Sequence, residues 1–280
     1  MSTDFQRARV VLGARLRELR TEAGLNGRDF AGRLGWPPSK VSKLENGKQT
    51  ATLADVEAWA QACAQPEAAA ELKGRLRGLE TSYRSWRRQL AAGHRSVQEA
   101  IGLQHERTST FRGFTGSVIP GIFQTEDYAR HVLTRYAELH GNSRDVEQGV
   151  HARLRRQDNL HTPGKQYRVL VWEAALTVLI CPPDVLAEQL DQLVTVAGLD
   201  TVSLGIIPLG VPVRIATGDD FWIHDDRLVI AETWHAEVWL DASEDVALYH
   251  RIWETLDEAA VYGRQAHRLI ARARRAVSSG

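Results

Sequence analysis

The stretch SKVSKLENGKQ, residues 39–49, sets two apolar residues among small polar and basic ones. Val41 and Leu44 are three residues apart, so a helix of about 3.6 residues per turn places them on one side. Ser39 and Lys43 then lie nearly opposite Val41. The stretch therefore predicts a helix held by one apolar seam, with a small, hydrogen-bonding and cationic face turned outward.

A face of this kind suits the major groove of double-stranded DNA. Lysine reads guanine acceptors there, and serine reads either donors or acceptors. Lys40 and Ser42 flank the exposed face and add one more group of each kind. The alternative is a solvated face of an ordinary helical bundle, which charge alone does not exclude.

Short helices with tight connections are predicted on both sides of this stretch. Asn26 with Asp29, and Thr52 with Asp55, have the spacing of N-cap residues followed by an acid three positions on. One helix before them has an apolar face of Leu12, Leu16, Leu19 and Ala23 and is stopped by Gly24. The sequence thus predicts a mainly α, helix-turn-helix bundle over residues 1–80.

Residues 9–63 resemble the lambda-repressor-like, XRE-type helix-turn-helix family. The resemblance is carried by Gly24-Leu25, Phe30-Ala31, Leu34-Gly35, Val41-Ser42, Leu44-Glu45 and Asn46-Gly47-Lys48. It implies that Pro38 to Leu44 form the recognition helix and that this unit binds double-stranded DNA. The residues implied to meet bases or nearby phosphates are Ser39, Lys40, Ser42 and Lys43.

The same resemblance implies contacts to the DNA backbone from Asn46, Lys48 and Gln49. The family usually has a glutamine at the start of its second helix, where it supports a phosphate contact. This chain has Gly27 at that position. We therefore expect Arg28 to replace it as a phosphate ligand.

Composition indicates an ordinary globular protein of about two domains, with 280 residues, of which 43% are hydrophobic and 25% charged. Basic and acidic residues number 35 each, so net charge indicates no partner. The first fifty residues, however, hold ten basic and five acidic residues. This excess predicts an anionic partner for the N-terminal part only.

Compartment and membrane association follow from two further features. Cys63 and Cys181 have neither metal nor redox spacing, which is typical of reduced thiols in a cytoplasmic protein. The most apolar stretch, YRVLVWEAALTVLICPP, is interrupted by Arg168 and Glu173 and is too short and polar to span a bilayer. We expect a cytoplasmic protein without a membrane partner.

The rest of the chain is predicted to form a second domain of a different class. Residues 81–112 have helix-forming composition and are expected to be a helical connector. Residues 220–240, DFWIHDDRLVIAETWHAEVWL, predict two or three antiparallel strands joined by polar turns. Amphipathic helix patterns surround them and two further strand candidates. Residues 113–280 are therefore predicted to be α+β, with a small antiparallel sheet.

Residues from about 85 to 275 resemble the C-terminal domain of actinobacterial regulators of the WhiJ/Scr antitoxin-like type. The motifs are Pro120-Gly121-Ile122-Phe123-Gln124-Thr125, Tyr128-Ala129, Arg156-Gln157, Trp172-Glu173-Ala174-Ala175-Leu176 and Gln189-Leu190. The resemblance implies a transcription factor that is often paired with a small protein encoded nearby. It implies no chemistry for this domain.

Nothing in the sequence indicates an enzyme. No glycine-rich phosphate loop, serine elbow or Cys–His arrangement is present. The densest titratable cluster is His224, Asp225, Asp226, Glu232 and His235, in which His224 and Glu232 on one hairpin are candidates for a metal site. We favour polar turns and exposed strand faces, and predict no catalytic residue, no metal and no cofactor.

Tryptophans are unusually dense in the second half. Core packing is the default explanation, and an aromatic-lined effector pocket or partner surface formed by Trp172, Trp222, Trp234 and Trp239 is the alternative. Two functions stay open. One is a sequence-specific homodimeric regulator whose C-terminal domain senses a partner protein or a small hydrophobic effector. The other is an antitoxin-like module that sequesters a small partner protein and autoregulates its operon.

Overall fold

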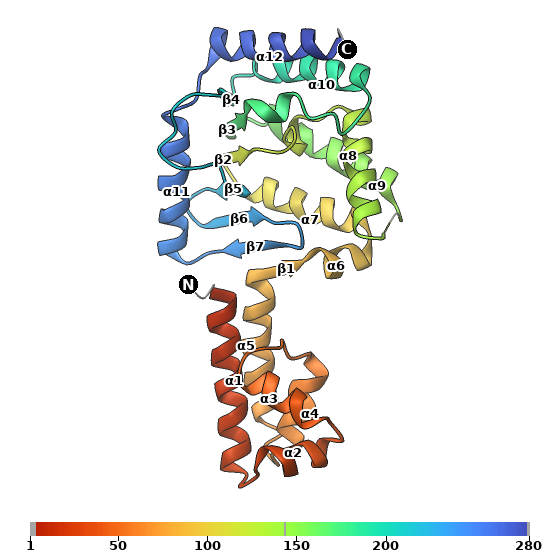
Figure 1. Ribbon diagram of the computed structural model, residues 1–280, viewed down its shortest axis with the longest axis vertical. Coiled ribbons are helices and arrows are strands. Elements are labelled where there is room, and N and C mark those ends of the chain that lie inside the picture. Colours follow the sequence, from red (N-terminus) through yellow and green to blue (C-terminus); the bar gives the residue numbers. More distant parts are fainter. Residues whose placement is uncertain (1–3, 143, 279–280) are drawn as a thin grey trace. The chain divides into compact units, whose positions relative to one another are not determined.

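The computed structural model describes residues 4–142 and 144–278, apart from the side chains of residues 4–7, 77–83 and 88. The chain divides into two compact units, Met1–Tyr83 and Arg84–Gly280 (Figure 1). Residues 81–112, expected to form a helical connector, include the first strand and the first helices of the second unit and the beginning of its next strand.

The first unit is a helical bundle, as predicted. Its described helices are α1 (Asp4–Glu22), α2 (Gly27–Leu34), α3 (Pro38–Glu45), α4 (Leu53–Ala62) and α5 (Ala68–Ser82). The apolar faces read from the sequence meet in one core, with Leu16, Leu19, Phe30, Val56 and Trp59 among its buried members. The Trp59 indole N–H donates to the carbonyl of Leu16 at 2.9 Å, which satisfies the polar atom of this buried ring.

Both predicted helix caps are confirmed. The side chain of Asn26 accepts hydrogen bonds from the backbone N–H groups of Arg28 and Asp29 at the start of α2. Thr52 and Asp55 form a reciprocal capping box at the start of α4. These side chains satisfy donors that the helices leave unpaired, and so they fix where each helix begins.

The contact between α1 and α3 depends on a glycine. A Cβ atom at Gly13 would lie 2.6 Å from the carbonyl oxygens of both Leu44 and Glu45. Any other residue would push the C-terminal end of α3 away from α1. The absence of a side chain therefore lets α3 pack closely enough to bury Val41 and Leu44, each 2% exposed.

The second unit contains a sheet and helices on both of its faces. Its strands are β1 (Tyr83–Ser85), β2 (Thr110–Thr115), β3 (Gln166–Trp172), β4 (Val202–Ile207), β5 (Asp220–His224), β6 (Leu228–Glu232) and β7 (Ala236–Leu240). Its α-helices are α6 (Trp86–Gln89), α7 (His94–Arg107), α8 (Glu126–Leu139), α9 (Val146–Arg155), α10 (Pro183–Val196), α11 (Ser243–Asp257) and α12 (Gly263–Ser278). Short 3₁₀ segments are η1 (Leu90–Ala92), η2 (Gly121–Phe123), η3 (Arg156–His161) and η4 (Glu173–Leu176).

The sheet is mixed, with strand order β1-β7-β6-β5-β2-β3-β4. The antiparallel run β5-β6-β7 predicted from residues 220–240 is confirmed, with polar turns in the expected places. The expectation of a small antiparallel sheet is corrected in two respects, because the sheet has seven strands and β2, β3 and β4 pair in parallel. Parallel strands require crossover connections, which the intervening helices provide.

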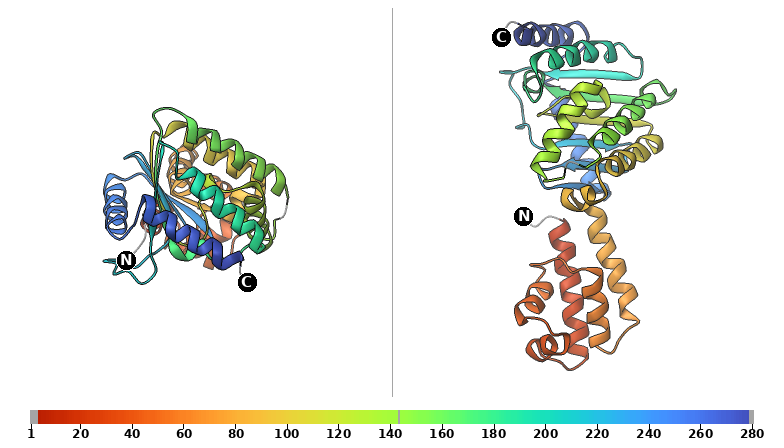
Figure 2. Two further views of the ribbon diagram at one scale, coloured as in Figure 1. Left: turned by 90° about the horizontal axis from the view of Figure 1, so that it is seen from above. Right: turned by 90° about the vertical axis from the view of Figure 1, so that its right-hand side faces the viewer.

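Helices lie on both faces of the sheet (Figure 2), and each face has its own apolar layer. On one face α8, α10 and α12 pack against Phe111, Tyr167 and Val169. On the other face α11 packs through Trp253 and Leu256. Successive side chains of a strand point to opposite faces of the sheet, so each strand contributes residues to both apolar layers. No described helix combines the length and the hydropathy that a bilayer crossing needs.

Strand β2 lies inside the sheet, between β5 and β3, but lacks the usual strand signature. Its sequence TFRGFT contains a glycine and an arginine, which weaken the alternation of apolar residues. Packing explains why position 113 is a glycine, since a Cβ there would lie 2.7 Å from the ring of Trp222 on β5. The indole of Trp222 thus crosses the neighbouring strand where that strand has no side chain.

We predict that Gly113→Ala destabilises the protein by about 1–3 kcal/mol, because the new methyl group overlaps a rigid ring. Gly102→Ala on α7 is the matched control, since a Cβ there meets nothing within 4 Å. The control should be stabilised by about 0.5–1 kcal/mol through helix propensity. Urea unfolding of the two variants measures the difference, and equal stabilities would contradict this account of Gly113.

Candidate functional site

The outward face of α3 is the candidate nucleic-acid interface in the first unit. Ser39, Ser42 and Lys43 are exposed, whereas Val41 and Leu44 are buried on the opposite side. Pro38 occupies the first turn, where its missing N–H costs no helical hydrogen bond. The helix therefore presents two hydroxyls and one ammonium group in the geometry that the spacing predicted.

Lys40 lies at the edge of this face and is engaged within the protein. Its ammonium group donates to the Asp55 carboxylate at 2.6 Å and lies 3.7 Å from the centre of the Trp36 ring. Burial alone would raise the pKa of Asp55, but hydrogen bonds from Lys40 and Thr52 outweigh it and lower the pKa. Lys40 thus ties α3 to the capping box of α4.

Asn46 follows α3 and is also bonded internally. Its amide nitrogen donates to the Ser42 carbonyl oxygen at 2.7 Å, and its oxygen accepts from the Arg17 guanidinium at 2.8 Å. Beneath it, Arg20 and Glu45 form a buried ion pair at 2.5 Å. These arginines of α1, which the sequence reasoning did not select, hold the C-terminal end of α3 in place.

The remaining predicted DNA ligands are all exposed. Lys48 and Gln49 follow α3 in a turn whose backbone N–H groups donate to the carbonyl of Lys43 at 2.8 and 3.2 Å. Arg28 lies in the first turn of α2, with its side chain in solvent. The structure therefore leaves Ser39, Ser42, Lys43, Lys48, Gln49 and Arg28 available at the surface of the first unit.

Lys40 and Lys43 form a matched pair on one helix with different surroundings. We predict that Lys40→Ala lowers the stability of the protein by about 1–3 kcal/mol, because the Asp55 carboxylate, with a side chain 9% exposed, loses its charged partner. Lys43→Ala should change stability by less than about 0.5 kcal/mol. Urea unfolding distinguishes the two, and an equal loss in both would contradict the proposed difference in their roles.

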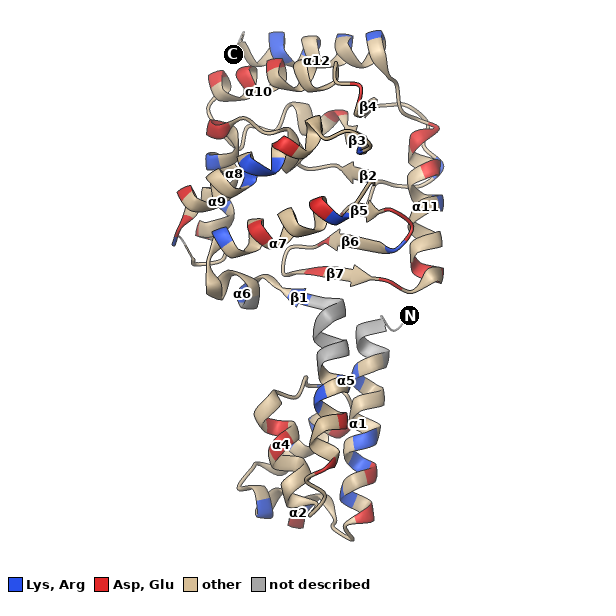
Figure 3. Cartoon of the chain, turned by 180° about the vertical axis from the view of Figure 1, so that it is seen from behind, with Lys and Arg blue, Asp and Glu red and all other residues tan. Residues whose placement is uncertain are grey.

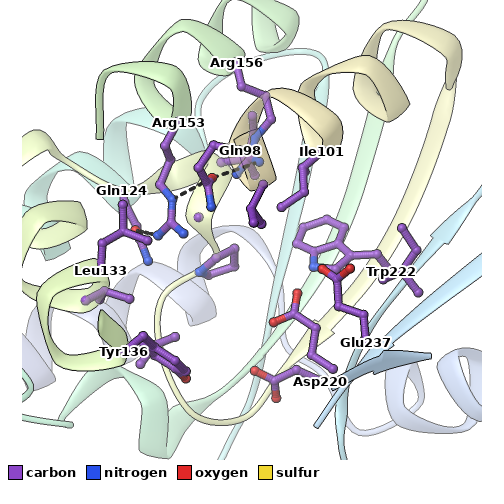
Figure 4. A pocket seen from close by; sticks show the side chains of 18 of the residues that line it. Gln98, Ile101, Gln124, Leu133, Tyr136, Arg153, Arg156, Asp220, Trp222 and Glu237 are labelled. Carbon is purple, nitrogen blue, oxygen red and sulfur yellow. Dashed lines mark hydrogen bonds between the residues drawn. The ribbon is translucent and has the colours of Figure 1, made fainter. Parts of the chain in front are cut away.

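The second unit contains a cavity of about 160 Å³ between the sheet and helices α7, α8 and α9. Figure 4 shows two kinds of polar wall in it. Arg153 and Arg156 approach from one side, whereas Asp220 and Glu237 approach from the other. Apolar side chains, including Ile101 and Trp222, line the space between.

The basic wall is built by the end of α9 and the start of η3. Arg153 donates to Gln98 at 3.2 Å and to Gln124 at 2.6 Å, and Arg156 donates to the same Gln98 oxygen at 3.4 Å. Burial lowers the pKa of Arg153 to about 10 and that of Arg156 to about 9. Both groups stay cationic at neutral pH.

The acidic wall is built by adjoining antiparallel strands. Figure 3 shows acidic residues in β6 and β7. By sequence these are Glu232 on β6 and Glu237 on β7. Asp220 on the neighbouring strand β5 pairs in register with Glu232. Burial raises the pKa of all three carboxyl groups, and that of Glu232 reaches about 8. Among these three acids Glu237 is buried, Asp220 is half-buried and Glu232 is exposed to solvent.

Two buried histidines lie at the inner end of this cavity. His105 stacks on Phe111 with ring centres 4.5 Å apart, and a nitrogen of His224 lies 3.1 Å from the Thr108 hydroxyl. Burial lowers the pKa of His105 well below its usual value and that of His224 to about 4. Both imidazoles are therefore neutral at neutral pH.

The four tryptophans proposed as an effector or partner site do not come together. Trp222 lines the cavity, whereas Trp172 packs against the core on the other side of the sheet. Trp239 stacks under the Arg84 guanidinium at 3.5 Å. Trp234 is 74% exposed and its ring centre lies 6.4 Å from that of Tyr136.

His224 and Glu232 both border the cavity but stand at opposite ends of the β5–β6 hairpin, opposite Leu228 and Asp220 respectively. Within residues 4–142 and 144–278, no group of three His, Cys, Asp or Glu residues has the arrangement of a metal site. Both thiols are buried, and burial raises the pKa of Cys63 and of Cys181 to about 11.

Comparison with known proteins agrees with this geometry. A family model described as a helix-turn-helix domain matches residues 11–72. The chain is thus a DNA-binding regulator of the helix-turn-helix class. A second model, described as a domain of unknown function (DUF5753), matches residues 100–272, which is more than half of the sequence. The chain belongs to the DUF5753 family.

Comparison with curated proteins found no match. Among solved structures, the chain is similar to TrmBL2, described as an archaeal chromatin protein whose structure shows a novel mode of DNA binding. The identity is 12%, the similarity covers 75% of this chain and 69% of the other, and the TM-score is 0.35. A likeness of this size supports no inference about function.

The cavity is the feature that sequence reasoning missed. In the sequence, Arg156 belongs to one of the family motifs and Glu232 to the titratable cluster of residues 224–235. They are far apart in the sequence, and only the packing of α9 and η3 over the sheet brings them to one cavity. The available signal was weak: Arg153 and Arg156 are three residues apart next to the apolar positions Val150 and Leu154.

Proposed function

We propose that this protein is a sequence-specific transcriptional regulator that binds a double-stranded DNA operator through the outer face of α3. The observation that carries the proposal is the segregation of this short helix. Val41 and Leu44 are each 2% exposed, and Ser39, Ser42 and Lys43 lie in solvent. Small hydroxyls and a cation on a helix that follows a tight turn are the groups that read base edges in the major groove.

The turn after α3 and the start of α2 extend this surface with cations. Lys48 is placed by backbone hydrogen bonds to the end of α3, so a phosphate contact there would be set in register with the helix. Arg28 stands in the first turn of α2, whose N-terminal end also favours anions. Phosphate contacts of this kind position a protein on DNA without specifying sequence.

We predict that Ser39→Ala and Lys43→Ala each weaken operator binding by about 1–3 kcal/mol where the side chain makes a good base contact. Lys48→Ala should weaken binding to all sequences alike and reduce the salt dependence by about one counterion. Gel-shift titration at several salt concentrations measures both effects.

Arg75→Ala is the control, because it removes one exposed cation of α5 that pairs with Glu71. It should leave operator specificity unchanged. If the double variant Ser39→Ala/Lys43→Ala kept full operator affinity, the assignment of α3 as the recognition helix would be wrong.

We infer further that the protein acts as a homodimer on an inverted repeat, in the manner of the XRE-type regulators it resembles. One helix-turn-helix unit contacts few base pairs, and pairing on half-sites one helical turn apart multiplies the specificity. Apolar residues that remain exposed on the second unit include Leu139, Leu179, Leu209 and Trp234. Trp253 is buried in the core and does not contribute to this surface.

We predict that the full chain sediments as a dimer and that a fragment of residues 1–80 is folded, monomeric and a much weaker operator binder. Sedimentation velocity on both proteins, with gel-shift titration of the same samples, decides the matter. A monomeric full-length protein contradicts the proposal, and so does a tight dimer of the fragment alone.

The second unit is proposed to receive the signal that controls DNA binding. A small effector is favoured over a protein partner because the cavity, with its opposed charges, lies within one unit. Mass spectrometry of the native protein distinguishes the two, since it separates a bound small molecule from a co-purifying small protein. The second result would favour the antitoxin-like arrangement of the WhiJ/Scr type.

A further inference from the structure

The charges on the two walls of the cavity in the second unit are not paired with each other. Among the described residues, neither Arg153 nor Arg156 forms an ion pair with a carboxylate; their bonds go to the neutral amides of Gln98 and Gln124. Arg156 is buried and Arg153 is half-buried, and because amides alone hold their guanidinium groups, these groups keep most of their positive potential for another partner.

On the basic wall, Arg156 is the residue whose hydrogen-bonding capacity is least satisfied. Its side chain belongs to a residue 7% exposed, and its Nε atom has no hydrogen-bond partner. Its hydrogen bond to Gln98 is long, at 3.4 Å. A buried donor without a partner is costly, so its persistence points to an acceptor that enters the cavity.

Glu232 is the corresponding group on the acidic wall. No described residue forms a hydrogen bond or ion pair with its carboxyl group. Its neighbours are occupied, since Asp220 accepts from the Gly116 N–H at 2.8 Å and from Ser117 at 2.9 Å, and Glu237 accepts from the Trp239 indole at 3.1 Å. One acid among three is therefore left for a donor that enters the cavity.

We propose that this cavity binds a small zwitterion whose anionic end contacts Arg153 and Arg156 and whose cationic end contacts Glu232. The proposal rests on the effector role given above to the second unit, and names the chemical class of that effector. Opposite charges on opposite walls fix the direction of such a ligand, while a ligand with one charge would leave the other wall unpaired.

The space between the two walls determines the chemical character of the part of the ligand that joins its two charged ends. Trp222 and Ile101 on one side, and Leu133 and Tyr136 on the other, give it an apolar lining (Figure 4). The volume of about 160 Å³ is close to that of an engineered protein cavity of about 150 Å³ that holds benzene. A ligand of this class therefore has a short hydrocarbon body between its charged ends.

The test uses ω-amino acids as probes on the full-length protein, with binding measured by isothermal titration calorimetry. The series γ-aminobutyrate, δ-aminovalerate and ε-aminocaproate varies the separation of the charges. Caproate and pentylamine are the matched probes that lack one end of ε-aminocaproate. At least one member of the series should bind at least about tenfold more tightly than its two single-charge analogues.

Glu232→Gln isolates the cationic end, because it keeps the shape and removes the charge. This variant should lose about tenfold or more in affinity for the zwitterion and bind the carboxylate-only probe as the wild type does. Glu188→Gln, an exposed acid of α10 outside the cavity, is the control and should leave both affinities unchanged. Arg156→Gln should weaken both probes.

Protonation gives a second measurement, which a merely structural role of Glu232 would not affect. Its pKa of about 8 keeps it largely neutral in the empty cavity at neutral pH, and an ammonium group beside it would lower that pKa. Zwitterion binding should therefore release a proton, and affinity should rise as the pH rises toward about 8. The charged groups that face Glu232 are Asp220, Glu237, Arg153 and Arg156.

The proton release should appear as a dependence of the heat on buffer ionisation enthalpy and disappear in Glu232→Gln. The proposal is overturned if no member of the series binds. It is also overturned if caproate binds as tightly as the zwitterion, because the site would then recognise an anion only. Gel-shift titration is independent of both results: a zwitterion that binds without changing operator affinity removes the effector role but leaves the site.

Discussion

The apolar seam of α3 is the constraint on which the proposed DNA-binding face depends. Because Val41 and Leu44 must be buried, the rotation of α3 about its axis is fixed, and with it the choice of side chains that face outward. Gly13 lets the backbone of α1 come close enough for this burial, and the Arg20–Glu45 pair holds the far end of the helix. The face that remains is small. Lys40 bonds to Asp55, so in the proposed DNA complex the reading of bases falls to the hydroxyls of Ser39 and Ser42 and to Lys43.

In the second unit the corresponding constraint is electrostatic. A fold seldom keeps a buried guanidinium, here that of Arg156, and a buried carboxyl group, here that of Glu237, in one cavity without pairing them, because each charge loses hydration and gains little in return. Hydrophobic residues in these places would pack the cavity more stably. Groups whose pKa values are displaced by burial gather at functional sites more often than elsewhere. Stability alone thus gives no reason for the arrangement of Arg156 and Glu232, whereas a bound molecule gives one.

The sequence predicted those parts of the structure that depend on local rules. Capping pairs, the seam of α3 and the strands of residues 220–240 follow from spacing and from turn residues, and all of them are confirmed. Strand β2 was not predicted because its glycine, Gly113, is explained only by packing against Trp222, a residue more than a hundred positions away. The cavity was not predicted either, because residues distant in the sequence form it. Its walls come from α9, η3 and three strands, and no periodicity within one element shows that they will meet.

The histidines beneath the cavity limit how its charge can change. His105 and His224 are too deeply buried to become protonated near neutral pH, so they cannot balance an added anion or lose charge to an added cation. The guanidiniums also keep their protons in that range. Glu232, with a pKa of about 8, is the group whose charge follows its surroundings near neutral pH. In the proposed complex, the cationic end of the ligand would lower this pKa and favour the anionic form of Glu232. Binding of the proposed ligand would thus be coupled to the charge of one carboxyl group on the β6 strand.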